Sequence, residues 1–181
     1  GSPAGRLAVL ENTNHNRSNG TATAFFSLFE GENDPAAAQA LFAAGFDWAR
    51  RRGLTVMRGP QGFTARDGLG LLVRGFEHRP AFGIPYHLPY YEDLLLRNGF
   101  EPGGDILSGY LGPKVRFPDR IHQVAARVME RRGLRVGRFR SRNDLLRLAP
   151  VLGELYNQSL GGTSGNVPLT DDKVQAIARQ M

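Results

Sequence analysis

The stretch YHLPYYEDLLLRNGFEPGGDILSGYL, residues 86–111, contains a helix start, a helix stop and an apolar run in close succession. Pro89 suits the first helical turn, where a missing N–H costs no hydrogen bond. Glu92 and Asp93 follow Pro89, and Arg97 lies two residues before Gly99. Negative charge near the start of a helix and positive charge near its end are both favoured by the helix dipole. Gly99 favours a left-handed stop. We therefore expect a helix over 89–97 and a strand over 106–111.

The residues before this stretch predict a hairpin, a helix and a further strand. Runs 6–12 and 21–30 are β-like, and the turn-rich NHNRSNG between them predicts a loop. Asp34 followed by proline predicts a helix start, and apolar residues then recur at helical spacing to residue 52. The short run 54–57 predicts the next strand, which ends before a proline that cannot donate to a ladder.

A long irregular segment, 62–89, separates that strand from the next helix. It carries many glycines and prolines around the strand-like GLLVRGF, residues 70–76. Ordered segments of this length are often functional, so we expect part of a binding site there.

The tail of the chain predicts more helices than strands. The pattern favours a helix over 118–132 and a strand over 134–140. Ser141 or Asn143 would cap the following helix, and Thr170 would cap another. That last helix has no stop signal before the sequence ends, so we interpret the chain as part of a longer protein.

The order of hairpin, helix, strand, helix and strand over residues 5–111, with its Asn-Gly-Phe turn, resembles the GNAT superfamily of acyl-CoA-dependent N-acyltransferases. The resemblance implies an α/β fold with a GNAT-like mixed, largely antiparallel sheet flanked by helices. Residues 1–113 would form a GNAT-like unit that lacks its first elements, and residues 114–181 resemble the opening of a second unit. With two such units in tandem, the sequence resembles a little-characterised bacterial subfamily of the GNAT superfamily. Alternatively, the tail completes the first sheet in permuted order.

GNAT enzymes hold the pyrophosphate of acetyl-CoA on backbone N–H groups at the start of their central helix, where the helix dipole also favours an anion. The resemblance places that loop at Gly31, Glu32 and Asn33, with acetyl-CoA or another acyl-CoA as the ligand. The chain departs from the family's glycine-rich pattern, because Gly31 stands alone and Glu30, Glu32 and Asp34 bring carboxylates. Like charges repel, so an ordinary capped helix start is the alternative interpretation.

A tyrosine four residues before the glycine of the Gly-Phe turn often serves this superfamily as general acid, and Leu95 occupies that position here. Leucine cannot transfer a proton, so Tyr91 and Tyr90 of the same helix are the candidate catalytic acids. His87, in the adjoining polar loop, is a candidate general base for an amine. Alternatively, the tyrosines only pack as amphipathic side chains, and the histidine lies in solvent without a catalytic role.

Arg58 and Gly59 follow a predicted core strand at its C-terminal end, where α/β sheets tend to bind ligands. We expect their backbone groups to hold a pantetheine-like or peptide-like chain, which adds both residues to the candidate cofactor site. A tight turn required by the topology is the equally open alternative.

Arginines between Lys114 and Arg147 greatly outnumber acidic residues and form a basic block that can attract phosphate or a polyanion. A solvated helix face that meets an acidic protein is the preferred interpretation, so we do not expect nucleic acid as a partner. No apolar run approaches the roughly 20 residues that span a bilayer, so we also expect no membrane partner.

The chain has no cysteine, which excludes disulfides, thiolate metal sites and a cysteine nucleophile and is compatible with a cytoplasmic protein. Its histidines do not fall at metal-ligand spacings, so we expect no metal. The predicted function is transfer of an acyl group from acyl-CoA to a small-molecule amine. The alternative is a non-catalytic GNAT-like module that binds a small molecule, a protein or a polyanion, and a homo-oligomer is compatible with either function.

Overall fold

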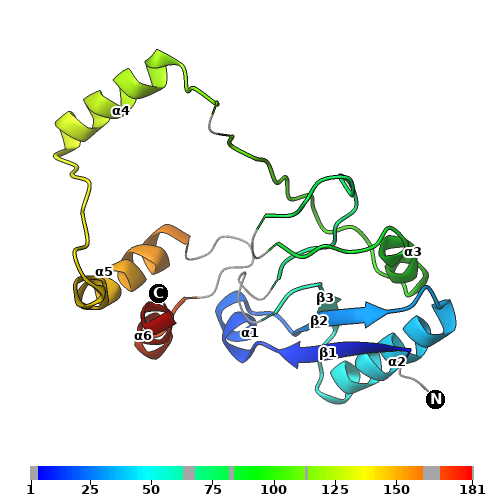
Figure 1. The fold of residues 1–181 in the computed structure, drawn as a ribbon. Coiled ribbons are helices and arrows are strands. Elements are labelled where there is room, and N and C mark those ends of the chain that lie inside the picture. Colours follow the sequence, from blue (N-terminus) through cyan, green and yellow to red (C-terminus); the bar gives the residue numbers. More distant parts are fainter. Residues whose placement is uncertain (1–3, 63–67, 82–83, 113, 161–167, 181) are drawn as a thin grey trace. The chain divides into compact units, whose positions relative to one another are not determined.

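Figure 1 shows the computed structural model of the chain, which describes residues 4–62, 68–81, 84–112, 114–160 and 168–180. This part of the chain is mixed α/β, with six helices and one three-stranded sheet. In chain order its elements are β1 (Gly5–Glu11), α1 (Thr13–Asn19), β2 (Thr23–Gly31), α2 (Pro35–Arg51), β3 (Val56–Arg58), α3 (Tyr90–Arg97), α4 (Asp119–Arg132), α5 (Arg142–Leu160) and α6 (Asp171–Gln180).

The chain divides into two compact units. The first comprises Gly1–Asp105 and Leu155–Leu169, and the second comprises Ile106–Glu154 and Thr170–Met181. The predicted division into residues 1–113 and 114–181 stays a prediction. The assignment of either part to a GNAT-like unit stays a prediction.

The first unit is built on a mixed sheet in the order β1-β2-β3. β1 and β2 pair antiparallel along most of their lengths, whereas β2 and β3 pair parallel over only three residues, Thr23–Phe25 of β2. α2 makes the crossover that parallel neighbours require. The predicted mixed sheet is confirmed, and β3 begins later than the predicted run 54–57.

β2 contains a bulge at Leu28. The pairing shifts between Arg6, opposite Glu30, and Ala8, opposite Ser27, so β2 carries one residue more than β1 in this interval. Leu28 has a φ of 51°, which is uncommon for a residue with a side chain, and is 60% exposed. Bulges of this kind re-aim a strand and are frequent beside functional sites.

The prediction of a loop at NHNRSNG is wrong, because these residues form most of α1. Asn12 caps the helix by accepting a hydrogen bond from His15 N at 3.1 Å, and Gly20 ends it with a φ of 62°. Asn16 joins α1 to β2, donating to Thr23 O and accepting from Thr23 N, both at 3.0 Å. Asparagine and glycine favour turns and helix ends alike, so the local pattern did not separate the two.

α2 confirms the predicted helix and covers one face of the sheet. Asp34 caps it by accepting hydrogen bonds from the N–H groups of Ala36 and Ala37 at 2.9 and 3.2 Å. Its buried residues recur at helical spacing. The main core cluster combines β2, α2 and α3 through Phe26, Phe29, Ala38, Phe42, Tyr91, Leu94 and Leu95.

α3 confirms the predicted helix and begins one residue later, at Tyr90. Gly99 follows it with a φ of 82°, as the predicted stop requires. Arg97 pairs with Asp93 one turn earlier at 2.6 Å, on the exposed side of the helix. The opposite side, which includes the fully buried Leu94, packs into the core.

Three predicted strands do not form in the described part of the chain. The runs 106–111 and 134–140 have no strand partner, and near GLLVRGF there is only an isolated bridge between Gln61 and Leu69. The apolar side chains of the runs 106–111 and 134–140 stay outside a core, as at Leu107, which is 95% exposed, whereas Leu71 of GLLVRGF packs against the main core cluster. An apolar run becomes a strand only where another strand offers its backbone, which the local pattern does not report.

In the second unit, α4 confirms the predicted helix, and Gly133 ends it with a φ of 60°. α5 and α6 meet where Gly153 faces Val174, since a Cβ at Gly153 would lie 2.5 Å from Val174 Cγ2. Val174 N donates to Thr170 O at 3.0 Å, so α6 starts at the predicted cap.

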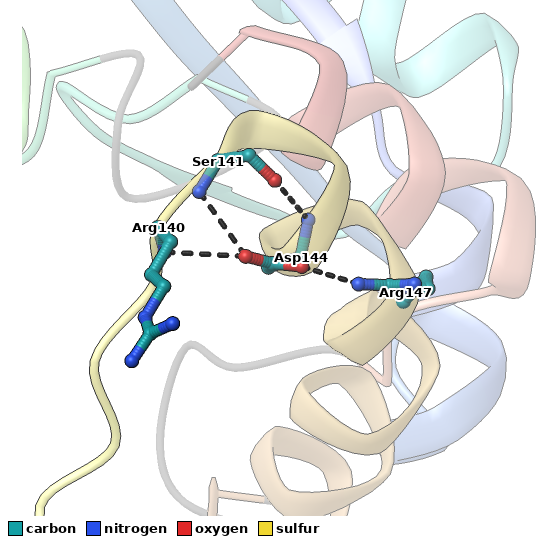
Figure 2. A network of polar contacts seen from close by, with 4 residues as sticks. All are labelled: Arg140, Ser141, Asp144 and Arg147. Carbon is teal, nitrogen blue, oxygen red and sulfur yellow. Dashed lines mark hydrogen bonds and ion pairs between the residues drawn. The ribbon is translucent and has the colours of Figure 1, made fainter.

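The start of α5 is held by a reciprocal capping arrangement (Figure 2). Asp144 N donates to Ser141 Oγ at 3.2 Å, and Ser141 N donates to the Asp144 carboxylate at 3.1 Å. Arg140 N donates to the same carboxylate oxygen at 3.2 Å, and Arg147 pairs with the other one. Ser141, rather than Asn143, is therefore the cap.

We expect acid to weaken this helix start. The hydrogen bond from Arg147, followed by those from Arg140 N and Ser141, holds the pKa of Asp144 below its ordinary value of 3.8. The contribution of this carboxylate to stability is complete above the pKa of the unfolded chain and is lost as pH falls through the lower pKa of the folded protein. An NMR titration of the Asp144 carboxyl carbon should give a midpoint below 3.8. A midpoint at or above that value would contradict the arrangement.

Candidate functional site

Tyr90 and Tyr91 on α3 lie against Gly31 at the end of β2, and Figure 1 shows α3 close to that end of the strand. The Tyr90 hydroxyl donates to Gly31 O at 2.8 Å, and Gly31 N donates to the Tyr91 hydroxyl at 3.3 Å. The two rings stack with their centroids 4.9 Å apart. The structure thus brings together two candidate catalytic residues and one candidate cofactor residue from distant parts of the sequence.

The surroundings of Tyr90 favour its protonated form. Desolvation raises the pKa of Tyr90 above 10.0, and the neighbouring Tyr91 hydroxyl and Glu32 carboxylate raise it further. A phenol with a raised pKa keeps its proton at neutral pH. Tyr90 therefore holds its proton at neutral pH, and that proton is directed at Gly31 O.

His87 adjoins this pair, with its ring centroid 5.6 Å from that of Tyr91. Its Nδ1 accepts a hydrogen bond from Leu72 N at 3.2 Å, and burial lowers the pKa of His87 below 6.5. The neutral ring then carries its proton on Nε2, because Nδ1 is the acceptor. In this arrangement His87 anchors the loop, and its role as a general base stays a prediction.

The start of α2 has few unbonded N–H groups for a phosphate. Gly31 N donates to a tyrosine, as described, and Glu32 N donates to Ala4 O at 3.2 Å. Asp34 takes the first two helical N–H groups with its own carboxylate. Glu32, Asn33 and Asp34 are all exposed, so two carboxylates stand where the anion would approach. This helix start does not fit the pyrophosphate of an acyl-CoA.

Arg58 and Gly59 lie where β3 leaves the sheet. A Cβ at Gly59 would lie 2.5 Å from both the ring and the carbonyl oxygen of Phe26, so glycine is needed for the chain to pass. Two residues later, Gln61 N donates to Phe26 O at 2.8 Å. These contacts fit the tight-turn interpretation. They place Arg58 and Gly59 in a different group of contacts from Tyr90 and Tyr91. The exposed bulge at Leu28 lies along β2 between the two groups.

A second polar cluster, absent from the predicted candidates, lies at the other end of β2. His15 on α1 is 5% exposed, and its ring centroid lies 5.0 Å from that of Phe25 in an edge-on arrangement. Asn19 Nδ2 lies 3.4 Å from His15 Nδ1. Burial, and then the charge of Arg58, lower the pKa of His15 below 6.5, so the ring is neutral at pH 7. The i, i+4 spacing of His15 and Asn19 would have indicated this cluster if α1 had been predicted.

The described residues lack the features of two other classes of site. They contain no group of three or more histidine, cysteine, aspartate or glutamate residues that could hold a metal ion. The helices among them do not combine the length and the apolar composition that crossing a membrane requires.

Comparison with known proteins finds similarity to two bacterial proteins along the whole chain. Over 183 aligned positions it is 24% identical to Protein YghO of Escherichia coli (strain K12), covering 46% of that protein. Over 185 positions it is 26% identical to Bacterial ceramide synthase of Caulobacter vibrioides (strain NA1000 / CB15N), covering 47% of that protein. No family model and no solved structure matches the chain. The chain thus spans about half the length of each of these two relatives.

Proposed function

We propose that this chain is part of a GNAT-like N-acyltransferase, in which the amine of one substrate attacks the carbonyl of an acyl thioester. The order of β1, β2, α2, β3 and α3 supports the proposal, since it follows the implied order as far as α3, although α1 interrupts the predicted hairpin and the strand expected after α3 does not form among the described residues. The name of one relative also supports it. A ceramide is an amide formed from a fatty acid and a long-chain amino alcohol, so Bacterial ceramide synthase is named for making an amide. We propose a related amine and acyl donor for this chain.

The observation that carries the proposal is the position of the tyrosine pair, Tyr90 and Tyr91, on Gly31. In the reaction a C–N bond forms and the thioester C–S bond breaks, the amine loses a proton and the departing thiolate takes one up. Tyr90 carries a proton at neutral pH, and it would give that proton by turning its hydroxyl from Gly31 O to the thiolate, at a cost because its pKa is raised. Gly31, to which Tyr90 donates, lies three residues beyond Leu28, which is 60% exposed.

The acyl donor would not use the start of α2 for its phosphates. In the proposed enzyme another part of the natural polypeptide holds the pyrophosphate, and this unit supplies the proton donor. No step depends on an anion bound at Gly31.

The test uses the natural polypeptide with a long-chain amine and an acyl-CoA. We expect Tyr90→Phe to lower kcat about a hundredfold, the low end for loss of a general acid because the Tyr91 hydroxyl remains. Amide formation is measured by mass spectrometry, and urea unfolding is measured on the same variant. The matched control is Tyr86→Phe, which removes the exposed hydroxyl that donates to Phe76 O at 2.9 Å.

The control should leave kcat unchanged. If Tyr90→Phe lowers the unfolding free energy but keeps full kcat, the pair only fastens α3 to β2, and Tyr90 is not the acid. Failure of the natural polypeptide to form any amide would remove the enzymatic proposal itself.

A non-catalytic module is the second candidate. It is favoured by Leu95, which occupies the family's acid position and is buried in the core at 7% exposure. The bonded N–H groups at the start of α2 favour it too. Calorimetric titration of the natural polypeptide with acyl-CoA separates the two functions, because an enzyme must bind its donor and this module need not.

A further inference from the structure

α4 carries an apolar stripe that is exposed along its whole length. Positions i, i+3, i+4, i+7 and i+8 of the stripe are apolar, the spacing of one helix face. We call this the α4 stripe; it comprises Ile121, Val124, Ala125, Val128 and Met129. Its larger side chains are 38–51% exposed, and α4 buries no residue at all. A stripe with this spacing normally faces a core, so its exposure calls for a partner.

The charged side chains of α4 are sorted around this stripe except for Arg132, the last residue of the helix, which lies on the line of the stripe. Arg120, Arg127 and Arg131 recur at spacings of seven and four and form one line along its edge. Both acidic residues of the helix, Asp119 and Glu130, lie on the opposite face. An arginine at such an edge can lay its stem along apolar material and keep its guanidinium at an anionic layer.

The segments on both sides of α4 continue the same composition. Every described residue from Lys114 to Arg140 is exposed. Within this stretch nine cationic residues face two carboxylates, and exposed apolar residues are interspersed with them. The exposed apolar residues outside the helix are Val115, Phe117, Leu134, Val136 and Phe139.

We propose that α4 and its flanks bind an anionic phospholipid surface, with the α4 stripe in the acyl region and the arginines at the phosphates. A helix with one apolar face and a cationic border binds in this way. Nucleic acid would use the charge but leave the apolar stripe in water. A folded protein would offer a groove of fixed shape, whereas the flanks here have no regular structure. The proposal depends on α4 and its flanks and not on the acyltransferase activity.

A lipid partner differs from the expectation that the chain has no membrane partner. That expectation considered only segments long enough to cross a bilayer, and none of the described helices is of that kind. A helix that lies in the headgroup region needs only one apolar face and has no minimum span.

The absence of cysteine in the chain allows a direct test. Val128→Cys lies in the α4 stripe, and Ala126→Cys lies on the polar face of the same helix; both sites are exposed. Each variant of the full chain is labelled with an environment-sensitive dye and mixed with vesicles of equimolar phosphatidylglycerol and phosphatidylcholine. We expect a blue shift at residue 128 and little change at residue 126. Equal responses at the two sites, or none at either, would overturn the proposal.

Sedimentation with the same vesicles then measures how much of the binding depends on the apolar stripe and how much on the arginine charge. Val128→Glu should weaken binding at least about tenfold, whereas Ala126→Glu adds the same charge on the polar face and should have a much smaller effect. Removing Arg127 and Arg131 together by substitution with glutamine should weaken binding roughly 20-fold. Removing Arg17 and Arg51, which are exposed on other helices, is the control for net charge.

Vesicles of pure phosphatidylcholine and high salt should both reduce binding, since the arginines act on phosphate charge. Binding to duplex DNA with no binding to anionic vesicles would assign the block to a polyanion instead. Capture of an acidic protein in the absence of any vesicle binding would assign it to a protein partner. Either result contradicts the proposal.

Discussion

Replacing Phe42 by alanine is expected to lower the unfolding free energy of the first unit by about 3–5 kcal/mol. Phe42 is fully buried at the centre of the core. Its ring centroid lies 5.3 Å from that of Phe26, 4.8 Å from that of Phe29 and 5.1 Å from that of Phe100. The truncation therefore removes contacts from the sheet, from α2 and from the residues after α3 at once.

Urea unfolding followed by tryptophan fluorescence measures this effect. The single tryptophan, Trp48, lies on α2 with Arg52 stacked 4.6 Å above its ring, so it reports the first unit. The matched control is Phe117→Ala, because this phenylalanine is 48% exposed and lies in the other unit. The control should stay within about 0.5 kcal/mol of the parent chain. Similar losses in both variants would mean that the cluster around Phe42 is not the core.

Gly59→Ala is expected to destabilise the first unit by about 3 kcal/mol, the upper end for overpacking. The added Cβ would lie 2.5 Å from the backbone oxygen of Phe26 as well as from its ring, and a backbone atom cannot rotate aside. The hydrogen bond from Gln61 N to Phe26 O should weaken together with the close approach.

Amide hydrogen exchange at Gln61 and the Trp48 unfolding curve give two readouts of this substitution. Gly103→Ala is the control, since a Cβ there has no heavy atom within 4 Å. The control should exchange and unfold like the parent chain. Normal protection of the Gln61 amide in Gly59→Ala would mean that β3 leaves the sheet by a different path.

The helices could be predicted because their boundaries are local. Asp34 caps α2, Gly99 stops α3 and Gly133 stops α4, each within a few residues of the element that it bounds. Strands lack this property, because their hydrogen bonds depend on a partner far away in sequence. The run 106–111 has the composition of a strand and no strand beside it.

The sequence named Tyr90, Tyr91 and Gly31 as candidates but did not predict that they lie in contact. The position of Leu95 directed attention to Tyr91 one turn earlier, on the same helix face. That the tyrosine hydroxyls would meet the backbone of Gly31 depends on how α3 docks, and no local pattern contains this information. His15 escaped prediction because its helix was mistaken for a turn, which hid the spacing that pairs it with Asn19.

The extra residue in β2 shifts the alternation of side chains between the two faces of the sheet by one residue. Phe26 and Phe29 both reach the core although they are three apart, an odd interval that would place them on opposite sides of a regular strand. A chain lacking Leu28 would bring the two rings to an even interval on the same side. The inserted leucine is thus dispensable for the hydrophobic interior, and deleting it would reshape only the outward contour of the strand.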